Sequence, residues 1–143
     1  MKHVAVLHEP YARDVLSGVK TVESRLSRVR CAPFGKVSVG DTIYIKVAGG
    51  SYVASAVADE VEYHENMTPR EVLALVRRLN AQIRAPAGYW RSKRTARFAT
   101  MIWLRDVRAR KTGPRIPVLH GRGWLVLDDA KPRRSSRKGM PLA

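Results

Sequence analysis

The chain is expected to form an α+β fold, a small β-barrel of about five to six mostly antiparallel strands flanked by two or three helices. Short segments rich in β-branched and aromatic residues recur between turns that contain glycine, as they do in antiparallel sheets. One later segment has the helical period and a full set of helix start signals. The length of 143 residues suits a single domain, which buries roughly two thirds of the surface that its unfolded chain exposes.

The first elements are a strand and a short helix. Residues 3–9, HVAVLHE, are short and β-branched, which favours a strand. Pro10 is compatible with the first turn of a helix, and Gly18 can end that helix in a left-handed conformation. Lys20 lies just past this carboxyl end, where a cation meets the negative pole of the helix dipole. From residue 21 the chain reads as a second strand.

The later strands are bounded by turn signals. A Gly-Asp turn at 40–41 precedes one of them, and a Gly-Gly turn at 49–50 separates it from the next. The expected strands cover residues 42–47, 52–63, 97–110 and 123–127. Residues 128–143 are basic and rich in Ser and Pro, so we expect one domain over residues 1–127 and a flexible tail over residues 128–143.

The clearest helix follows Thr68. The run T-P-R-E supplies a threonine N-cap, a proline at the first helical position and Glu71 at the third, which together make a capping box. Apolar residues then recur at spacings of four, three and four residues, which predicts a helix over residues 69–84. Three arginines, each seven residues from the next, form a row roughly opposite this apolar stripe and must face solvent or a partner: Arg70, Arg77 and Arg84.

The net charge is +15, and its distribution along the chain is uneven. Residues 1–69 hold 8 Lys/Arg and 8 Asp/Glu, whereas residues 70–122 hold 14 basic residues against 2 acidic ones. A surplus of one sign on this scale produces a positive field that attracts polyanions. Nucleic acid is the class of partner that this charge favours.

An aromatic pair lies inside this basic half. Tyr89 and Trp90 are followed by four cations, Arg91, Lys93, Arg94 and Arg97. Aromatic rings stack on bases and cations contact phosphates, so this segment is expected to bind nucleic acid. The alternative is that Trp90 seals the barrel while the arginines solvate a loop.

The segment at 17–26, SGVKTVESRL, concentrates charge directly after the first helix. Alternation in a strand places Thr21, Glu23 and Arg25 on one face. Taken alone, the charges have a structural explanation in which Lys20 neutralises the helix end and Glu23 pairs with Arg25 on an exposed strand. Such exposed pairs contribute only about 0–1 kcal/mol.

Together with its surroundings, this segment resembles the ASCH domain, a relative of the PUA RNA-binding fold. The family hallmark G-x-K-x-x-E-x-R is matched by Gly18, Lys20, Glu23 and Arg25, and the Gly-Asp turn before the strand at 42–47 also agrees. The resemblance covers residues 3–127 in element order and is sharpest over residues 10–47. It implies a PUA-like β-barrel with a helix-flanked cleft and a role linked to RNA, and some members are reported to be hydrolases.

One branch of the family implies a particular enzyme activity. Its members remove the acyl group from N4-acetylcytidine with a lysine in the motif, a threonine three positions on and a glutamate before the next helix. Lys20 matches the lysine and Glu65 matches the glutamate, but Glu23 occupies the position of the threonine and cannot do the same hydroxyl chemistry. Another branch is described as ribonucleolytic, and Lys20, Glu23 and Glu65 would serve there as general acid and base.

Chemistry distinguishes the roles of these three residues. A lysine acts as a base near neutral pH only where its pKa is lowered, and neighbouring carboxylates have the opposite effect. We therefore expect Lys20 to be an electrostatic clamp and Glu23 or Glu65 to be the base, with Arg25 and Thr21 beside them in the cleft. The alternative for Glu65 is that it favours the amino end of the helix that starts near residue 69.

Three hypotheses of function follow. The first is an RNA-binding module whose cleft accepts a nucleotide or base, the second is a hydrolase of RNA or of a modified nucleoside, and the third is an adaptor that binds proteins through the basic helix. A single cysteine, Cys31, and the lack of a zinc-type Cys/His spacing favour a cytoplasmic protein with no metal or cofactor. No segment approaches the ~20 apolar residues that span a bilayer, so no membrane partner is expected, and the oligomeric state is left open.

Overall fold

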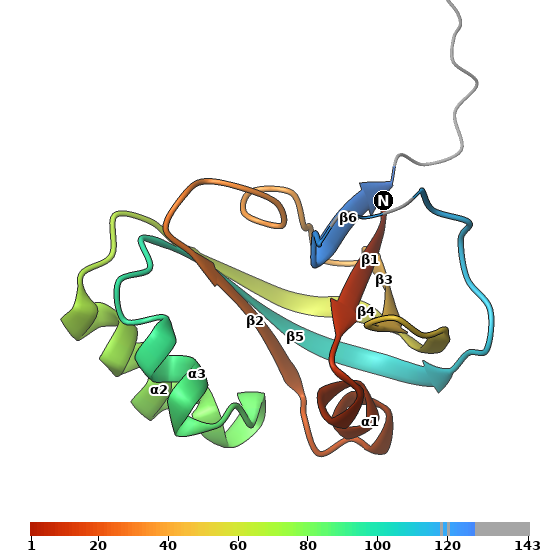
Figure 1. Cartoon of the computed structure of the whole chain (residues 1–143), viewed down its shortest axis with the longest axis horizontal. Coiled ribbons are helices and arrows are strands. Elements are labelled where there is room, and N and C mark those ends of the chain that lie inside the picture. Colours follow the sequence, from red (N-terminus) through yellow and green to blue (C-terminus); the bar gives the residue numbers. More distant parts are fainter. Residues whose placement is uncertain (118, 120, 128–143) are drawn as a thin grey trace, which may run out of the picture.

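The strands form one curled sheet (Figure 1), seen in a computed structural model that describes residues 1–117, 119 and 121–127. In chain order they are β1 (Lys2–Leu7), β2 (Val22–Ser27), β3 (Thr42–Val47), β4 (Tyr52–His64), β5 (Phe98–Ala109) and β6 (Trp124–Leu127). Their order across the sheet is β2-β5-β4-β3-β1-β6, and β1 pairs with β3 in parallel while the other neighbours are antiparallel. The predicted α+β fold with a mostly antiparallel sheet is confirmed, and the predicted tail lies outside the described residues.

The helices of the described chain are α1 (Glu9–Ser17), α2 (Pro69–Ile83) and α3 (Ala87–Ser92). The local end signals act as predicted, because Gly18 ends α1 with φ of 86° and Thr68 forms a capping box with Glu71 at the start of α2. No helix was predicted from the sequence over residues 87–92, which form α3. This helix has six residues and no side-chain cap, so its local signal is weak. Within the described residues, no helix has the length and apolar run needed to cross a bilayer.

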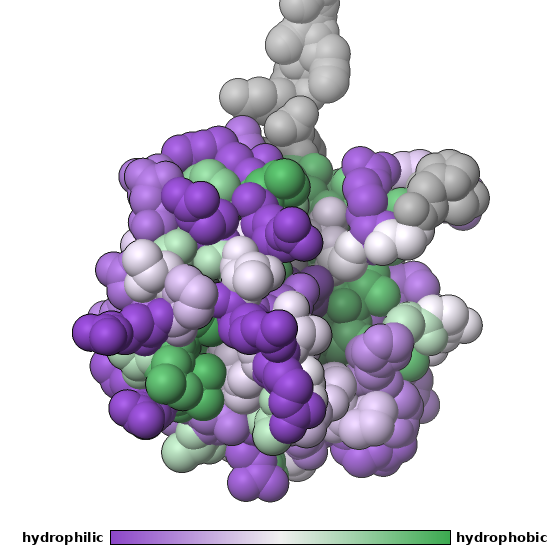
Figure 2. All heavy atoms as spheres, turned by 60° about the vertical axis from the view of Figure 1, so that its left-hand side comes forward, coloured by the Kyte–Doolittle hydropathy of each residue, from purple (hydrophilic) through white to green (hydrophobic). Residues whose placement is uncertain are grey.

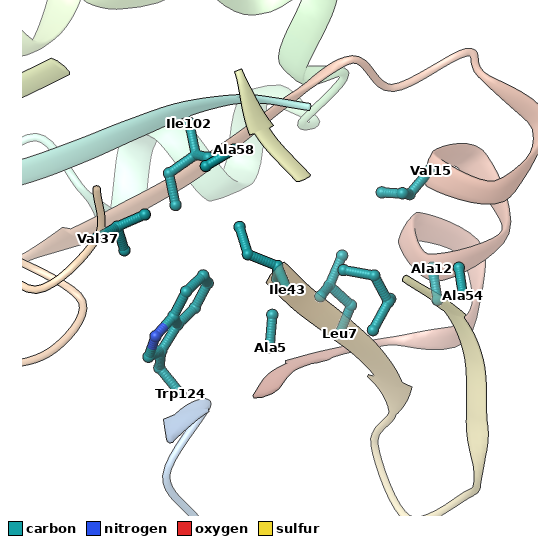
Figure 3. Close-up of a cluster of buried hydrophobic side chains, with 11 residues drawn as sticks. Ala5, Leu7, Ala12, Val15, Val37, Ile43, Ala54, Ala58, Ile102 and Trp124 are labelled. Atoms are coloured by element: carbon teal, nitrogen blue, oxygen red, sulfur yellow. The ribbon is translucent and has the colours of Figure 1, made fainter. Parts of the chain in front are cut away.

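Two apolar clusters hold these layers together. The first lies inside the curl of the sheet, where Figure 3 shows Trp124, Ile43 and Leu7 among the side chains that pack with α1. The second lies between the outer face of β2 and β5 and the two helices α2 and α3, and it includes Trp90 and Met101. The helices α2 and α3 therefore cover one end of the sheet, beside β2 (Figure 1).

Buried hydrogen bonds between polar side chains stabilise the edge of the sheet that β1 and β6 form. Trp124 Nε1 donates to His3 Nδ1 at 3.1 Å, and His3 Nε2 lies 2.8 Å from Asp41 Oδ2. Because Nδ1 accepts, the ring proton of neutral His3 belongs on Nε2, which donates to the carboxylate. Burial alone would raise the pKa of Asp41, but the Ser38 amide, His3 and the chain amino group hold it below its ordinary value. The aspartate of the predicted Gly-Asp turn thus fixes the strand edge that carries Trp124.

Candidate functional site

A cleft with a volume of about 540 Å³ opens at the seam of the curled sheet. Residues of β2 line one side of it, and residues of β1 and the start of β6 line the other, with parts of α1, α3 and the loop at 31–34 completing the wall. The wall contains several aromatic side chains, namely Tyr11, Phe34, Tyr89, Phe98 and Trp124. The cleft predicted from the family resemblance is therefore present, and the motif segment lines it.

Lys20 lines the cleft and is only 5% exposed. Its Nζ donates to the backbone oxygen of Ile83 at 2.6 Å and lies 3.5 Å from Glu23 Oε1. Ile83 is the last residue of α2, so its carbonyl has no partner inside the helix and lies at the negative pole of the helix dipole. The helix end that the Lys20 side chain neutralises is thus that of α2, whereas the sequence analysis assigned it to the first helix.

Glu23 is a buried, ionised carboxylate between two cations. It is 4% exposed, and its Oε2 accepts a hydrogen bond from Arg25 Nε at 2.7 Å. Burial alone would raise the pKa of Glu23, but Arg25 and then Lys20 hold it below its ordinary value. The interpretation of this pair as exposed is therefore wrong, and the cleft contains a charged hydrogen-bond acceptor at neutral pH.

Arg25 joins the two edges of the seam. Its Nη2 atom donates to the backbone oxygen of Val6 on β1 at 3.0 Å. Its Nη1 atom donates to the backbone oxygen of Gly123, next to β6, at 3.0 Å. The guanidinium also lies over the Trp124 ring, with Cζ 5.3 Å from the ring centroid. The motif arginine therefore closes the curled sheet as well as neutralising Glu23.

Tyr89 is a proton donor in the wall of the same cleft. Burial, together with the negative charge of Glu23, raises the pKa of its phenol, which shares a side-chain hydrogen bond with Ser24. Lys93 lies beside it, with Nζ 5.6 Å from the ring centroid, and donates to the backbone oxygen of Leu26 at 3.2 Å. The helix α3 thus contributes a protonated hydroxyl group and a cation to the cleft.

Three of the predicted site residues lie elsewhere. Thr21 is exposed and precedes β2, and it does not line the cleft. Glu65 is also outside the cleft, where its Oε1 accepts from Arg30 at 2.9 Å. Trp90 is 7% exposed and packs in the cluster between β2 and α2, so its ring faces are not available to a base. Lys20 and Glu23 therefore come together without Glu65.

The predicted nucleic-acid-binding arginines are exposed on and around α2 and α3: Arg70, Arg77, Arg84, Arg91, Arg94 and Arg97. None of them forms an ion pair within the part of the chain that the structure describes. Arg91 and Arg94 flank Lys93, which lines the cleft. Figure 2 shows that the side of the molecule carrying α2 and α3 is dominated by hydrophilic residues.

The sequence analysis did not identify several residues that line the cleft. They come from three separate segments and form no chemical motif: Phe34 from a loop, Phe98 and Thr100 from β5, and Trp124 from β6. Thr100 pairs with Arg25 across β2 and β5, so the register of the sheet would have identified it, but this register is not readable from one sequence. No group of three or more His, Cys, Asp or Glu that could hold a metal ion occurs in the described ranges.

The chain is similar to solved ASCH structures from Zymomonas mobilis. A tyrosine-to-phenylalanine variant matches with a TM-score of 0.61 and 22% identity, over 76% of this chain and 71% of that chain. A serine-to-alanine variant matches with a TM-score of 0.60 and 22% identity, over 76% and 70% of the two chains. The structure titled simply as ASCH has a TM-score of 0.60 and 21% identity, over 76% and 69%. No protein-family model and no curated protein matches the sequence. The chain therefore has the fold of an ASCH domain.

Proposed function

We propose that the chain is an RNA-binding module whose cleft accepts a nucleotide or a single base. The observation that carries this proposal is the ionised Glu23, held between Lys20 and Arg25 in a cleft of about 540 Å³ with aromatic walls. This volume lies within the range of small-ligand sites, about 300–1,000 Å³. A cleft that offers rings for stacking beside both signs of charge suits a base, which has a flat face and an edge of donors and acceptors.

Each polar group in the cleft has a complementary atom on a nucleotide. Glu23 accepts from the ring N–H and amino groups of a base, and the Tyr89 hydroxyl group donates to a ring nitrogen or a carbonyl oxygen. Lys20 gives one N–H to Ile83 and a second to Glu23, and its third N–H suits a carbonyl or phosphate oxygen. Two of these three groups, Glu23 and Lys20, are charged, and hydrogen bonds to charged groups are stronger than those between neutral groups.

The exposed cations beside the cleft supply affinity for the rest of the strand. Arg91 and Arg94 belong to the same short segment as Tyr89 and Lys93, so a strand leaving the cleft passes uncompensated positive charge. Contacts of this kind make nucleic-acid binding strong and dependent on salt. They give no sequence preference by themselves, so we assign base recognition to the cleft.

A hydrolase of RNA is the second candidate. The observation in its favour is that the cleft brings together an ionised carboxylate, Glu23, and a protonated phenol, Tyr89, which would serve as base and acid, with Lys20 as an electrostatic clamp. The pKa of Glu23 is lowered and that of Tyr89 is raised, so both lie further from neutrality than usual and each group is weakened in this role, which places the hydrolase second. Deacylation of N4-acetylcytidine is less favoured, because the glutamate expected to take part, Glu65, lies outside the cleft and pairs with Arg30.

Calorimetric titration with nucleoside monophosphates tests the cleft. Glu23→Gln keeps the size of the side chain but removes its charge, and we expect it to weaken binding by about 10- to 100-fold, since hydrogen bonds to charged groups contribute ~1.5–3 kcal/mol. Glu60→Gln makes the same change at an exposed position of β4 outside the cleft and should have no effect. Equal binding by the natural protein and Glu23→Gln would refute the cleft assignment.

Turnover separates the module from the enzyme. The natural protein, Glu23→Gln and Tyr89→Phe are incubated with end-labelled RNA and with N4-acetylcytidine, and products are separated by chromatography. The module predicts no product from any protein. Product that disappears in both variants while RNA affinity survives would establish the hydrolase instead.

The helical surface is tested with a longer RNA strand. The variant replaces three exposed arginines of this surface, Arg70, Arg77 and Arg84, by glutamine. It should weaken binding of the strand without changing the melting temperature or the binding of a mononucleotide. Unchanged strand affinity would remove α2 from the RNA surface. Binding that modest salt abolishes, without any preference among RNAs, would support a charge-driven adaptor instead.

A further inference from the structure

We infer a second nucleic-acid-binding surface, on the outer face of β3, β4 and β5, shaped for a single strand. We call it the outer platform and define it as the exposed or half-exposed side chains of Tyr44, Lys46, Arg108, Arg110, Lys111 and Arg115. None of these residues lines the cleft. No role was predicted from the sequence for any of these residues, and the outer platform does not depend on the cleft being a nucleotide site.

Strand alternation places these residues on one face. Ile43 and Ile45 are buried in the core cluster inside the curl, so Tyr44 and Lys46 between and after them point outward. Tyr44 pairs with Ser55 on β4, and Ser55 pairs with Arg108 on β5. A tyrosine and an arginine therefore lie in one row across three adjacent strands, separated by a small serine.

Contacts at the end of β5 extend this face. Arg110 Nε donates to Ser55 Oγ at 3.0 Å, which holds its guanidinium over the same row. The Tyr52 hydroxyl group donates to the backbone oxygen of Pro114 at 2.6 Å, and a Cβ atom on Gly113 would lie 2.8 Å from Tyr52 Cζ. The segment at 111–115 is therefore fastened across the Tyr52 ring, which brings the exposed Lys111 and Arg115 to the platform.

The charge of the platform is not compensated. Arg108, Lys111 and Arg115 form no ion pair within the described ranges of the chain. Arg105, a few residues earlier on the same strand, behaves differently, because it pairs with Asp59 at 3.0 Å and with Asp106 at 2.6 Å. The chain thus neutralises one arginine of β5 and leaves the cations that follow it available to a partner.

No helix of the described chain covers this part of the sheet. Helix α1 packs inside the curl, and α2 and α3 pack on the other end of the outer face, beside β2. An open sheet face that combines an aromatic ring with cations is typical of surfaces that stack bases and hold the phosphates between them. We therefore assign single-stranded nucleic acid as its occupant, because an acidic protein would use the cations but not the ring.

Fluorescence anisotropy with a single-stranded RNA of about 20 nucleotides, measured over a range of salt, tests the platform. The double variant Arg108→Gln, Lys111→Gln removes two unpaired cations, so we expect weaker binding and a salt slope smaller by about 1.4, from ~0.7 per phosphate contact. The matched control Arg13→Gln, Arg105→Gln removes the same net charge from two arginines that already pair with carboxylates. The control should change the affinity and the slope much less.

Tyr44→Leu tests the stacking part. It keeps an apolar side chain and all of the charge, and we expect a loss of roughly tenfold in affinity for the single strand, from the usual contribution of one stacked base. A duplex of the same sequence should bind more weakly to the natural protein and should not respond to this variant. Thermal unfolding of each variant verifies that it is folded at the temperature of the binding measurement.

Several results would overturn the inference. Equal losses of RNA affinity in the test and control double variants would indicate that net charge alone drives binding. An unchanged affinity in Tyr44→Leu would rule out stacking on the tyrosine ring. Displacement of RNA by polyglutamate at equal charge concentration would indicate a surface for any polyanion. Binding of a mononucleotide, measured in parallel, reports on the cleft alone. The platform and the cleft therefore fail or succeed independently.

Discussion

Removal of the Arg25 side chain should open the seam of the sheet. In Arg25→Ala the β1 and β6 edges lose two hydrogen bonds to β2, at Val6 and Gly123, and Trp124 loses the cation over its ring. Glu23 is then left buried, with Lys20 as its neighbouring cation at 3.5 Å. We expect the folded protein to persist but to be much less stable.

The size of the effect follows from these contacts. Breaking a buried ion pair by removing one partner costs about 3–5 kcal/mol, because the other charge stays in a poorly solvated place. The Arg25 side chain is 22% exposed, so water reaches part of the site and the lower end of that range applies. We therefore expect the free energy of unfolding to fall by about 3 kcal/mol, a large part of the 5–15 kcal/mol that is typical of a domain.

Urea unfolding followed by tryptophan fluorescence measures this change. Arg28→Ala removes an exposed arginine that follows the same strand and should change the free energy of unfolding by less than about 0.5 kcal/mol. The double variant Arg25→Met, Glu23→Gln also removes the carboxylate but leaves the buried Lys20 without a counterion, so it should not regain the stability that Arg25→Ala loses. A loss below about 1 kcal/mol for Arg25→Ala, which is that of an exposed pair, would refute the seam-closing role.

Three further predictions concern stability. Although burial favours the neutral acid, Arg25 and Lys20 hold the pKa of Glu23 below its ordinary value of 4.5. The contribution of ionised Glu23 to the free energy of unfolding is therefore complete above pH 4.5 and is lost as the pH falls through the pKa of the folded state. Urea unfolding at a series of pH values should show a shallower decline of stability at acid pH in Glu23→Gln than in the natural protein. Thr68→Ala removes the capping box of α2 and should lower the free energy of unfolding by about 1 kcal/mol, whereas Thr68→Ser should retain most of it, both measured by thermal unfolding. Gly123→Ala would place a Cβ atom 2.6 Å from Arg25 NH1, so we expect a loss of about 1–3 kcal/mol that largely disappears in an Arg25→Met background; equal losses in both backgrounds would contradict this reasoning.

Local signals were sufficient for most of the fold. The capping box at Thr68 and the left-handed Gly18 are decided by a few neighbouring residues, and both occur where the sequence places them. The strand at 42–47 was predicted with its bounds because glycine turns lie on both sides of it. The helix α3 was missed, because it is held by burial of Trp90 against α2 and β2 rather than by signals of its own.

The site was predicted only as far as the motif reaches. Lys20, Glu23 and Arg25 lie within six residues of each other, so one strand and the turn before it bring them together. Glu65 follows β4 and pairs with Arg30, whose guanidinium lies over the rings of Phe34 and Phe98 in the cleft wall. Glu65 is therefore behind that wall and does not line the cleft, which its position in the sequence does not reveal. The basic residues around Trp90 indicated a nucleic-acid surface. Whether an aromatic side chain is exposed or buried depends, however, on the apolar residues of the elements that pack beside it, and here α2 and β2 bury Trp90.

The geometry also determines which variants report on chemistry. Lys20 ties the turn after α1 to the carboxyl end of α2, and Arg25 ties β2 to β1 and β6, so each cation supports the architecture as well as the charge of Glu23. Loss of activity in Lys20→Ala would therefore not distinguish a reacting lysine from a distorted cleft. Glu23→Gln and Tyr89→Phe each change a single polar group and leave these ties in place. A difference between these two variants in the binding of a nucleotide and in turnover is therefore the measurement that assigns a chemical role to the cleft.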